Sequence, residues 1–462
     1  MAKKAKTIFV CQECGYESPK WMGQCICGAW NSFVEEKVLP AKEDDPRRRS
    51  SSKGDKTAKA NKLKDICANK QEDRIDTGIG ELNRVLGGGM VKGSLTLISG
   101  EPGIGKSTLI MQAANNIATA GKRVLYISGE ESEIQLKMRA DRICPNLSDN
   151  LMVLSETNME NISECAKAMQ ADFLIVDSIQ TTYTAALDAA PGSVSQVRAC
   201  GNEMMRLGKM EGIPIFIVAH VTKSGELAGP KIVEHLVDCV LHFTGERNHE
   251  LRILRSFKNR FGTTSEIGAF EMAQQGLEEV ENLSQTFLEG MTLAREGSTV
   301  TAVYEGTRPL LLEIQALTST TNIGFARRTA IGIDIARLNM IIAVLERKAG
   351  LSLLNQDIYV NVVGGLKPEG TYTDLSVAMS IYSSFRDKAF SDKTILLGEI
   401  GLTGELRNVQ NAEKIVKEAV RMGFKKIILP YGNAKKLGSG MGDDVLIQGV
   451  KDINEAICAS FL

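Results

Sequence analysis

The sequence shows no excess of charge of either sign: 55 lysines and arginines face 56 aspartates and glutamates, for a net charge of −1. This balance argues against a protein that binds nucleic acid over its whole surface, so any such contact must come from local basic patches. Long apolar stretches are also missing, since no run of about 18 apolar residues occurs and the start MAKKAK is not followed by an apolar signal segment. We therefore expect a cytoplasmic protein with no membrane partner.

Disulfides are not expected in that compartment, although the chain has 10 cysteines. The first four crowd into one short segment as Cys11, Cys14, Cys25 and Cys27. Four thiolates in so compact a segment are typical of a structural Zn²⁺ site, which holds together a module too small for a core of its own. The alternative is a set of reduced thiols that binds metal only adventitiously. Trp21 and Trp30 are expected to pack on this module, with base stacking as the alternative.

The most specific motif is a Gly-rich run that matches the phosphate-loop pattern G-x-x-x-x-G-K-[ST]. A strand-like run at 94–99 precedes it and a helix-like run at 108–120 follows it, which is the setting that such a loop requires. The glycines let backbone N–H groups bend around phosphate oxygens, Lys106 supplies a positive charge near the β- and γ-phosphates, and Ser107 offers a hydroxyl to Mg²⁺. The residues predicted to bind ATP are Gly100, Glu101, Pro102, Gly103, Ile104, Gly105, Lys106, Ser107 and Thr108.

Two later strands end in acidic residues that would complete a site for ATP hydrolysis. The apolar strand at 173–177 ends in Asp177, which in a phosphate-loop fold belongs to the Mg²⁺ shell. The strand at 124–128 leads to Glu130 and Glu131, and a carboxylate at such a strand end can orient and deprotonate the attacking water. We favour Glu130 as the catalytic acid, with Glu131 as the second choice. The alternative is that this acidic, Ser-containing turn only caps the next helix.

A further strand, at 213–219, is followed by His220, which is placed to sense the γ-phosphate. A histidine that only satisfies local hydrogen bonds is the alternative. The next segment is rich in Gly and Pro and carries Lys223 and Lys231 at its ends. Because a loop of this composition suits a moving contact with a phosphate backbone, we expect both lysines to bind DNA.

These motifs divide the 462 residues into four parts. Residues 9–34 form the four-cysteine zinc-finger module, and residues 35–70 form a flexible basic linker with few large apolar side chains. Residues 71–285 alternate strand and helix patterns, which predicts a mostly parallel sheet flanked by helices. Residues 286–462 form a second α/β unit, so the predicted fold class is α/β throughout.

With these segments placed, the chain resembles the bacterial DNA repair family called RadA or Sms over residues 9–458. The resemblance rests on CQECGYESPKWMG (11–23), SGEPGIGKS (99–107), LYISGEES (125–132), HVTK (220–223), GPK (229–231) and KNRFG (258–262), the last being the family's own signature. It implies a RecA-like ATPase core followed by a Lon-protease-like domain, with ATP, Mg²⁺ and Zn²⁺ as cofactors. It also implies a homo-hexameric ring that works as a DnaB-type helicase on single-stranded and branched DNA, driving branch migration alongside the RecA recombinase.

Carried over to this sequence, the resemblance repeats the roles given above to the phosphate loop and Asp177, and it makes Glu130 the catalytic acid. Lys258 and Arg260 would point from one subunit into the ATP site of the next, or toward DNA. A cation supplied in this way stabilises charge on the γ-phosphoryl group and makes hydrolysis depend on contact with the neighbour. Without the motif, a Lys/Arg pair at a surface turn would be taken for two solvated side chains.

The sequence departs from the family pattern in two places. Only Ile26 separates the second pair of cysteines, where the family has two residues. In the C-terminal domain, Tyr372 stands where a Lon-type protease has its nucleophilic serine, and Glu413 stands at the position of the activating lysine, with Lys414 next to it. Ser376 is near in sequence but lies outside the motif. Proteolysis is therefore not expected, and a scaffold for ring assembly and DNA contact is preferred.

Arg327, Arg328 and Arg337 of this domain are the basic residues expected to face DNA in the ring, with a solvated surface as the alternative. The function that follows is a DNA-dependent ATPase and helicase of homologous recombination and repair. The alternative is a nucleotide-switched scaffold that binds single-stranded DNA and loads or stabilises a recombinase without translocating.

Overall fold

The computed structural model describes residues 6–13, 15–38, 74–219, 232–245, 251–280, 282–289, 291, 295–305, 307–321, 324–364, 368, 370–390, 393–437 and 445–461. The predictions for Cys14, His220, Lys223 and Lys231, and most of the predicted linker, lie outside these residues. The chain divides into two compact units, Met1–Val280 and Glu281–Leu462, which are described one at a time. Among the residues so described, no helix is both long and apolar enough to cross a membrane.

The N-terminal module is a three-stranded antiparallel sheet with the order β2-β1-β3. Its strands are β1 (Lys6–Cys11), β2 (Glu17–Ser18) and β3 (Phe33–Val38). Only Cys11, Cys25 and Phe33, of the residues described there, form its buried centre. So small a core is typical of modules that depend on a metal for stability.

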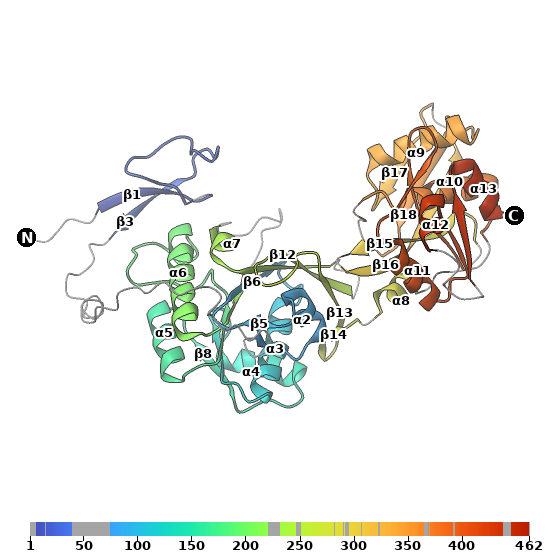
Figure 1. Ribbon diagram of the computed structural model, residues 1–462. Helices are drawn as coiled ribbons and strands as arrows, with labels where there is room; N and C mark the ends of the chain where they lie inside the picture. Colours follow the sequence, from blue (N-terminus) through green and yellow to red (C-terminus); the bar gives the residue numbers. More distant parts are fainter. Residues whose placement is uncertain are drawn as a thin grey trace, which may run out of the picture. The chain divides into compact units, whose positions relative to one another are not determined.

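The first unit is built on a nine-stranded sheet with the order β14-β13-β12-β11-β6-β10-β9-β7-β8 (Figure 1). The strands from β11 to β8 run parallel, and β12, β13 and β14 extend the sheet in antiparallel fashion. They are β6 (Leu95–Gly100), β7 (Val124–Ser128), β8 (Leu151–Ser155), β9 (Phe173–Asp177), β10 (Ile215–Val218), β11 (Cys239–Thr244), β12 (Leu251–Asn259), β13 (Ile267–Ala273) and β14 (Gly276–Glu279). The prediction of a mostly parallel sheet is confirmed.

Helices cover both faces of this sheet, as the uninterrupted apolar strands require (Figure 1). The helices are α2 (Gly80–Leu86), α3 (Lys106–Thr119), α4 (Glu133–Ile143), α5 (Met159–Ala168), α6 (Val194–Glu211) and α7 (Ile232–Leu236), and a small ribbon pairs β4 (Arg74–Ile75) with β5 (Met90–Val91). Helices α2, α3 and α4 pack on the face that carries Tyr126 and Ile175. Helices α5 and α6 pack on the opposite face, which carries Ile127 and Val176. The phosphate-loop helix α3 and the side chain of Tyr126 therefore share one face.

The second unit has a seven-stranded sheet with the order β17-β18-β16-β15-β19-β22-β23. Its strands are β15 (Ser298–Glu305), β16 (Arg308–Thr320), β17 (Arg328–Ile331), β18 (Gln356–Val362), β19 (Thr394–Leu396), β22 (Lys426–Pro430) and β23 (Leu446–Val450), beside a ribbon of β20 (Glu399–Ile400) and β21 (Leu406–Arg407). Its helices are α8 (Leu283–Leu288), α9 (Ile335–Lys348), α10 (Asp374–Arg386), α11 (Ala412–Arg421), α12 (Tyr431–Leu437) and α13 (Ile453–Phe461). Helices α9, α10 and α13 pack on one face of the sheet, and α11 packs on the other. This unit is also α/β, as predicted.

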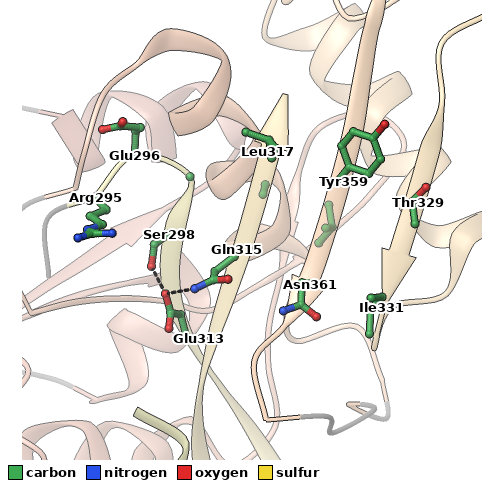
Figure 2. A pocket seen from close by; sticks show the side chains of 13 residues that line it. Arg295, Glu296, Ser298, Glu313, Gln315, Leu317, Thr329, Ile331, Tyr359 and Asn361 are labelled. Carbon is green, nitrogen blue, oxygen red and sulfur yellow. Dashed lines mark hydrogen bonds between the residues drawn. The ribbon is translucent and has the colours of Figure 1, made fainter. Parts of the chain in front are cut away.

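Part of the face that α11 covers is hollowed where β15, β16, β17 and β18 lie side by side (Figure 2). The hollow has a volume of about 480 Å³. At its floor, Glu313 accepts hydrogen bonds from Ser298 Oγ at 2.6 Å and from Gln315 Nε2 at 3.0 Å. Among the described residues that line it, none was predicted from the sequence to act in catalysis or binding.

Candidate functional site

The phosphate loop joins the end of β6 to the start of α3, so its backbone turns toward the N-terminus of a helix, where anions bind. The loop lies closely against its neighbours. A Cβ atom on Gly100 would come 2.5 Å from the carbonyl oxygen of Phe243, and one on Gly105, whose φ is +114°, would come 2.8 Å from Met272 Cε. Both positions therefore need glycine, as the motif predicts. Ser107 lies in the first turn of α3, next to Lys106.

Lys106 is buried over its own loop. Its Nζ donates hydrogen bonds to the carbonyl oxygens of Gly100 at 2.8 Å and Glu101 at 3.0 Å. Burial lowers the pKa of Lys106 from 10.5 to about 8, and the nearby carboxylates of Asp177 and Glu130 partly oppose this shift. Phosphate oxygens would favour the charged ammonium still more strongly, so this lysine is poised to gain from binding a triphosphate.

The two acids lie at the carboxyl ends of neighbouring strands. Strands β7 and β9 are paired so that Ser128 is opposite Asp177, and the N–H of Gly129 donates to the carbonyl oxygen of Asp177 at 2.8 Å. Glu130 follows directly, and its Oε1 accepts a hydrogen bond of 2.6 Å from Ser178 Oγ. Because both carboxylates also act on Lys106, the structure brings the lysine and the two acids into one site.

Glu131 points into a different set of contacts. Its Oε1 accepts a hydrogen bond of 2.7 Å from Arg139 Nη1 on α4. The cap of α4 is supplied by Ser132, whose hydroxyl accepts from the N–H of Gln135 while the Gln135 side chain accepts from the N–H of Ser132. The turn thus does cap a helix, but through Ser132, and this leaves Glu130 as the glutamate beside Lys106.

Tyr126 is a site residue that sequence reasoning missed. It is fully buried in β7, and its hydroxyl donates a hydrogen bond of 2.6 Å to Oδ2 of Asp177. Burial, and next the negative charge of Asp177, raise the pKa of Tyr126 well above its usual value of 10, so the hydroxyl remains a donor at physiological pH. The available signal was a tyrosine in the middle of an apolar strand, since a buried tyrosine usually has a hydrogen-bond partner.

Magnesium and zinc have different sets of candidate ligands. The carboxylate of Asp177 and the hydroxyl of Ser107 provide oxygen atoms, which Mg²⁺ prefers, and when bound it would neutralise charge on the phosphates. In the N-terminal module, the sulfur atoms of Cys11, Cys25 and Cys27 all lie within 4.8 Å of one another.

The zinc prediction is supported by the spacing of these sulfur atoms. Zn–S bonds of about 2.3 Å in a tetrahedron place the sulfurs about 3.8 Å apart, and the Sγ atoms of Cys11 and Cys27 are 3.9 Å apart. The single residue Ile26 between the second pair therefore does not turn either thiol away. Trp21 and Trp30 are 54% and 71% exposed, and their packing on the module stays a prediction.

Lys258 and Arg260 lie away from the phosphate loop of their own chain. Arg260 forms an ion pair of 3.0 Å with Asp238, and the other oxygen of Asp238 accepts a hydrogen bond from the N–H of Leu95 at 3.1 Å. Lys258 Nζ donates to the carbonyl oxygen of Glu234 at 2.8 Å. Leu95 begins β6 and the phosphate loop follows the other end of that strand, about 17 Å away at about 3.3 Å per residue.

The three arginines predicted to contact DNA lie in different surroundings. Arg327 is exposed, and its backbone N–H donates to Asp357 Oδ1 at 2.7 Å. Arg328 donates to backbone carbonyl oxygens, including that of Leu353 at 2.9 Å. Their role in DNA binding stays a prediction.

Arg337 is tied into the interior of the second unit. Its guanidinium donates to both carboxylate oxygens of the buried Asp374 and to the carbonyl oxygen of Ile400 at 3.0 Å. The hydrogen bonds to Asp374 raise the pKa of Arg337 above its usual value. For Arg337 as well, DNA contact stays a prediction.

The serine and the lysine nearest to the protease motif have separate partners. Ser376 is fully buried in α10 and donates to Thr299 Oγ1 at 2.9 Å. Lys414 donates to the hydroxyl of Tyr304 at 3.0 Å. The absence of proteolysis stays a prediction.

Comparisons with known proteins agree with this architecture. Residues 9–35 match the family model of a rubredoxin metal binding domain, residues 58–226 match that of an AAA domain, and residues 317–433 match that of subunit ChlI of Mg-chelatase. With the structure, these matches confirm a metal-binding ribbon, a RecA-like ATPase core and a C-terminal ChlI/Lon-like domain. A solved structure of the RadB recombinase overlaps 45% of this chain at 20% identity, but its TM-score of 0.37 is too low to support an assignment.

Full-length relatives give the family. The DNA repair protein RadA of Bacillus subtilis is 51% identical over 99% of both chains. The proteins of the same name from Halalkalibacterium halodurans and Listeria monocytogenes are 50% and 49% identical, again over 99% of both chains. The chain therefore belongs to the RadA family of DNA repair proteins.

Proposed function

We propose that this protein is a DNA-dependent ATPase and a hexameric helicase of the DnaB type, which promotes branch migration of recombination intermediates together with the RecA recombinase in the cytoplasm. The family supports a RecA-like ATPase in DNA repair. In this proposal the zinc-finger module spans 9–34, a linker spans 35–70, the ATPase spans 71–285, and the domain at 286–462 is a scaffold for ring assembly and DNA contact.

The chemistry of hydrolysis is assigned to side chains of one chain at the carboxyl ends of β6, β7 and β9. Lys106 binds the β- and γ-phosphates, for which it exchanges its hydrogen bonds to Gly100 and Glu101. Glu130 orients the attacking water and accepts its proton. Ser178 holds the carboxylate of Glu130 through the bond of 2.6 Å, so the base is oriented before the nucleotide arrives.

The observation that supports a ring assembly is the position of Arg260. Its backbone N–H donates to the carbonyl oxygen of Asp238 at 3.1 Å, at the N-terminal end of the parallel strands, whereas the phosphate loop lies at their C-terminal end. A side chain at the N-terminal end cannot reach the γ-phosphate of its own subunit. It can reach the site of a neighbour in a ring, where a cation completes the charge stabilisation and links hydrolysis to contact between subunits.

Unwinding of a forked duplex tests the proposal, with Lys106→Ala as the inactive variant. We expect ATP hydrolysis that rises with single-stranded DNA, displacement of one strand of the fork, and loss of both in Lys106→Ala. Lys122→Ala is the matched control, because Lys122 is an exposed lysine just after α3. Nucleotide-dependent DNA binding with no strand displacement, with or without RecA, would favour the loading scaffold, and unwinding that survives in Lys106→Ala would refute the motor.

A further inference from the structure

Four side chains from separate parts of the ATPase fold form one hydrogen-bonded chain that ends at Asp177. The hydroxyl of Tyr126 donates to Asp177 Oδ2 at 2.6 Å. Arg139 Nη2 donates to the same hydroxyl at 3.3 Å, and Arg139 Nη1 is bonded to Glu131 at 2.7 Å. The order along the chain is thus Glu131, Arg139, Tyr126, Asp177.

The fold explains why these groups meet. In the pairing of β7 with β9, Tyr126 is opposite Ile175, and Asp177 lies on the same face of β9 two residues later. Helix α4 packs on that face through Leu136 and Ala140, next to which Arg139 reaches the tyrosine. The hydroxyl therefore lies between the end of β9 and the helix that follows the catalytic turn.

We propose that Tyr126 is a positioning residue for Asp177, and that Arg139 holds the tyrosine hydroxyl in the orientation that this requires. The inference rests on the proposed role of Asp177 at Mg²⁺. Oxygen–oxygen distances of about 2.5–2.7 Å are typical of charge-assisted hydrogen bonds to a carboxylate. A bond of that kind to Oδ2 fixes the rotation of the carboxylate, so its metal-binding orientation exists before the ion arrives.

Packing alone does not account for this tyrosine. A phenylalanine would fill the same space between α3, α4 and the sheet without placing a hydroxyl in a fully buried position. Burying a hydroxyl is unfavourable unless it is hydrogen-bonded. Here the hydrogen bond of 2.6 Å joins it to the one residue of β9 that is assigned to the metal.

Tyr126→Phe removes only the hydroxyl, and the full-length protein can be tested without any turnover. Binding of a fluorescent ATP analogue is measured as a function of Mg²⁺ concentration, beside binding in EDTA. We expect the half-saturating Mg²⁺ concentration to rise about tenfold, the size typical of losing an outer partner of a metal ligand, while binding in EDTA stays unchanged. Arg139→Gln should shift the Mg²⁺ titration in the same direction by less.

Tyr183→Phe is the matched control, because Tyr183 is a half-buried tyrosine of the same domain, and no hydrogen bond of its hydroxyl is found among the described residues. A general loss of structure in Tyr126→Phe would weaken binding in EDTA as well, and thermal unfolding would report it. A half-saturating Mg²⁺ concentration that stays close to that of the unaltered protein would overturn the inference. A different result would show that the proposed role of Asp177 itself is wrong: if Asp177 does not act at Mg²⁺, Asp177→Asn leaves the Mg²⁺ titration unchanged.

Discussion

The position of Arg260 makes a quantitative prediction for rings assembled from two inactive variants. Arg260→Ala removes the proposed cation, and Lys106→Ala removes the phosphate-binding lysine. Each variant alone should lose about 10³-fold or more of the DNA-stimulated ATPase rate, which is the effect of removing a cation at the γ-phosphate in comparable sites. Lys106 follows the C-terminal end of β6, whereas Arg260 is bonded to Asp238 beside the N-terminal end of that strand. The two substitutions therefore damage the same site only if that site is shared between two chains.

The expected recovery follows from counting interfaces. In a ring assembled at random from equal amounts of both variants, an active interface needs an intact Lys106 from one chain and an intact Arg260 from the next. Each condition is met about half the time, so about a quarter of the interfaces should hydrolyse ATP if they act independently. If Arg260 acted within its own chain, each chain would carry one of the two defects and the mixture would be inactive.

The assay is steady-state ATP hydrolysis with single-stranded DNA, after the two proteins are mixed under conditions that allow subunits to exchange. Doubly substituted protein mixed with unaltered protein gives the reference for dilution of active chains. Thermal unfolding of Arg260→Ala is the control for stability, because the substitution also leaves Asp238, whose side chain is 9% exposed, without its ion pair. A mixture no more active than the sum of its parts would refute the shared site and would favour DNA as the partner of Arg260.

Three further predictions follow from the site, the second unit and the metal module. The pKa of Lys106 is about 8 because burial disfavours its charged form, so ATP binding should take up a proton, and the ATP affinity should fall by up to about tenfold per pH unit above that pKa. Calorimetry in buffers of different ionisation enthalpy measures the proton uptake, and an ATP affinity that does not change with pH would contradict the prediction. Arg337→Met should destabilise the protein by about 3–5 kcal/mol in denaturant unfolding, because the buried Asp374 must then stay charged without its partner or take up a proton. The exposed Arg327→Ala should cost about 0.5 kcal/mol or less, and equal stabilities of the two variants would contradict the structural role of Arg337. Elemental analysis should find one zinc ion per chain and a loss of zinc in Cys27→Ser, and a ratio near zero in the unaltered protein would contradict the site.

The parts of the fold that could be predicted are those whose signals are local. The strand predicted at 173–177 coincides with β9, and the helix predicted at 108–120 is displaced by only two residues at its start from α3. The start of α5, Met159–Ala168, depends on a cap, because the side chain of Asn158 accepts a hydrogen bond from the N–H of Asn161. Strands β13 and β14 were not predicted, although β13 is largely apolar; their places in the sheet follow from antiparallel pairing of β13 with β12 and of β14 with β13.

In the candidate site too, features set by neighbouring residues in the sequence could be predicted, and features set by distant residues could not. The phosphate loop is contiguous in the sequence and could be recognised there, although the close contacts at Gly100 and Gly105 come from Phe243 and Met272 on other strands. The choice between Glu130 and Glu131 is not local. It depends on Arg139, which lies two turns into α4, and on Ser178, which follows a different strand. No spacing within the turn contains that information.

Tyr126 shows how some of this missing information can be recovered by reasoning about strand order. A residue and its hydrogen-bond partner 51 positions away cannot be paired by periodicity. Once the strand that ends in Asp177 is placed beside β7, however, the alternation of side chains puts residues 126 and 177 on one face. A hydroxyl on that face can reach the carboxylate, whereas one displaced by a single residue points to the other side of the sheet. A lone tyrosine in an apolar strand next to the metal-side acid is therefore a usable signal, provided that its register relative to the acid is derived first.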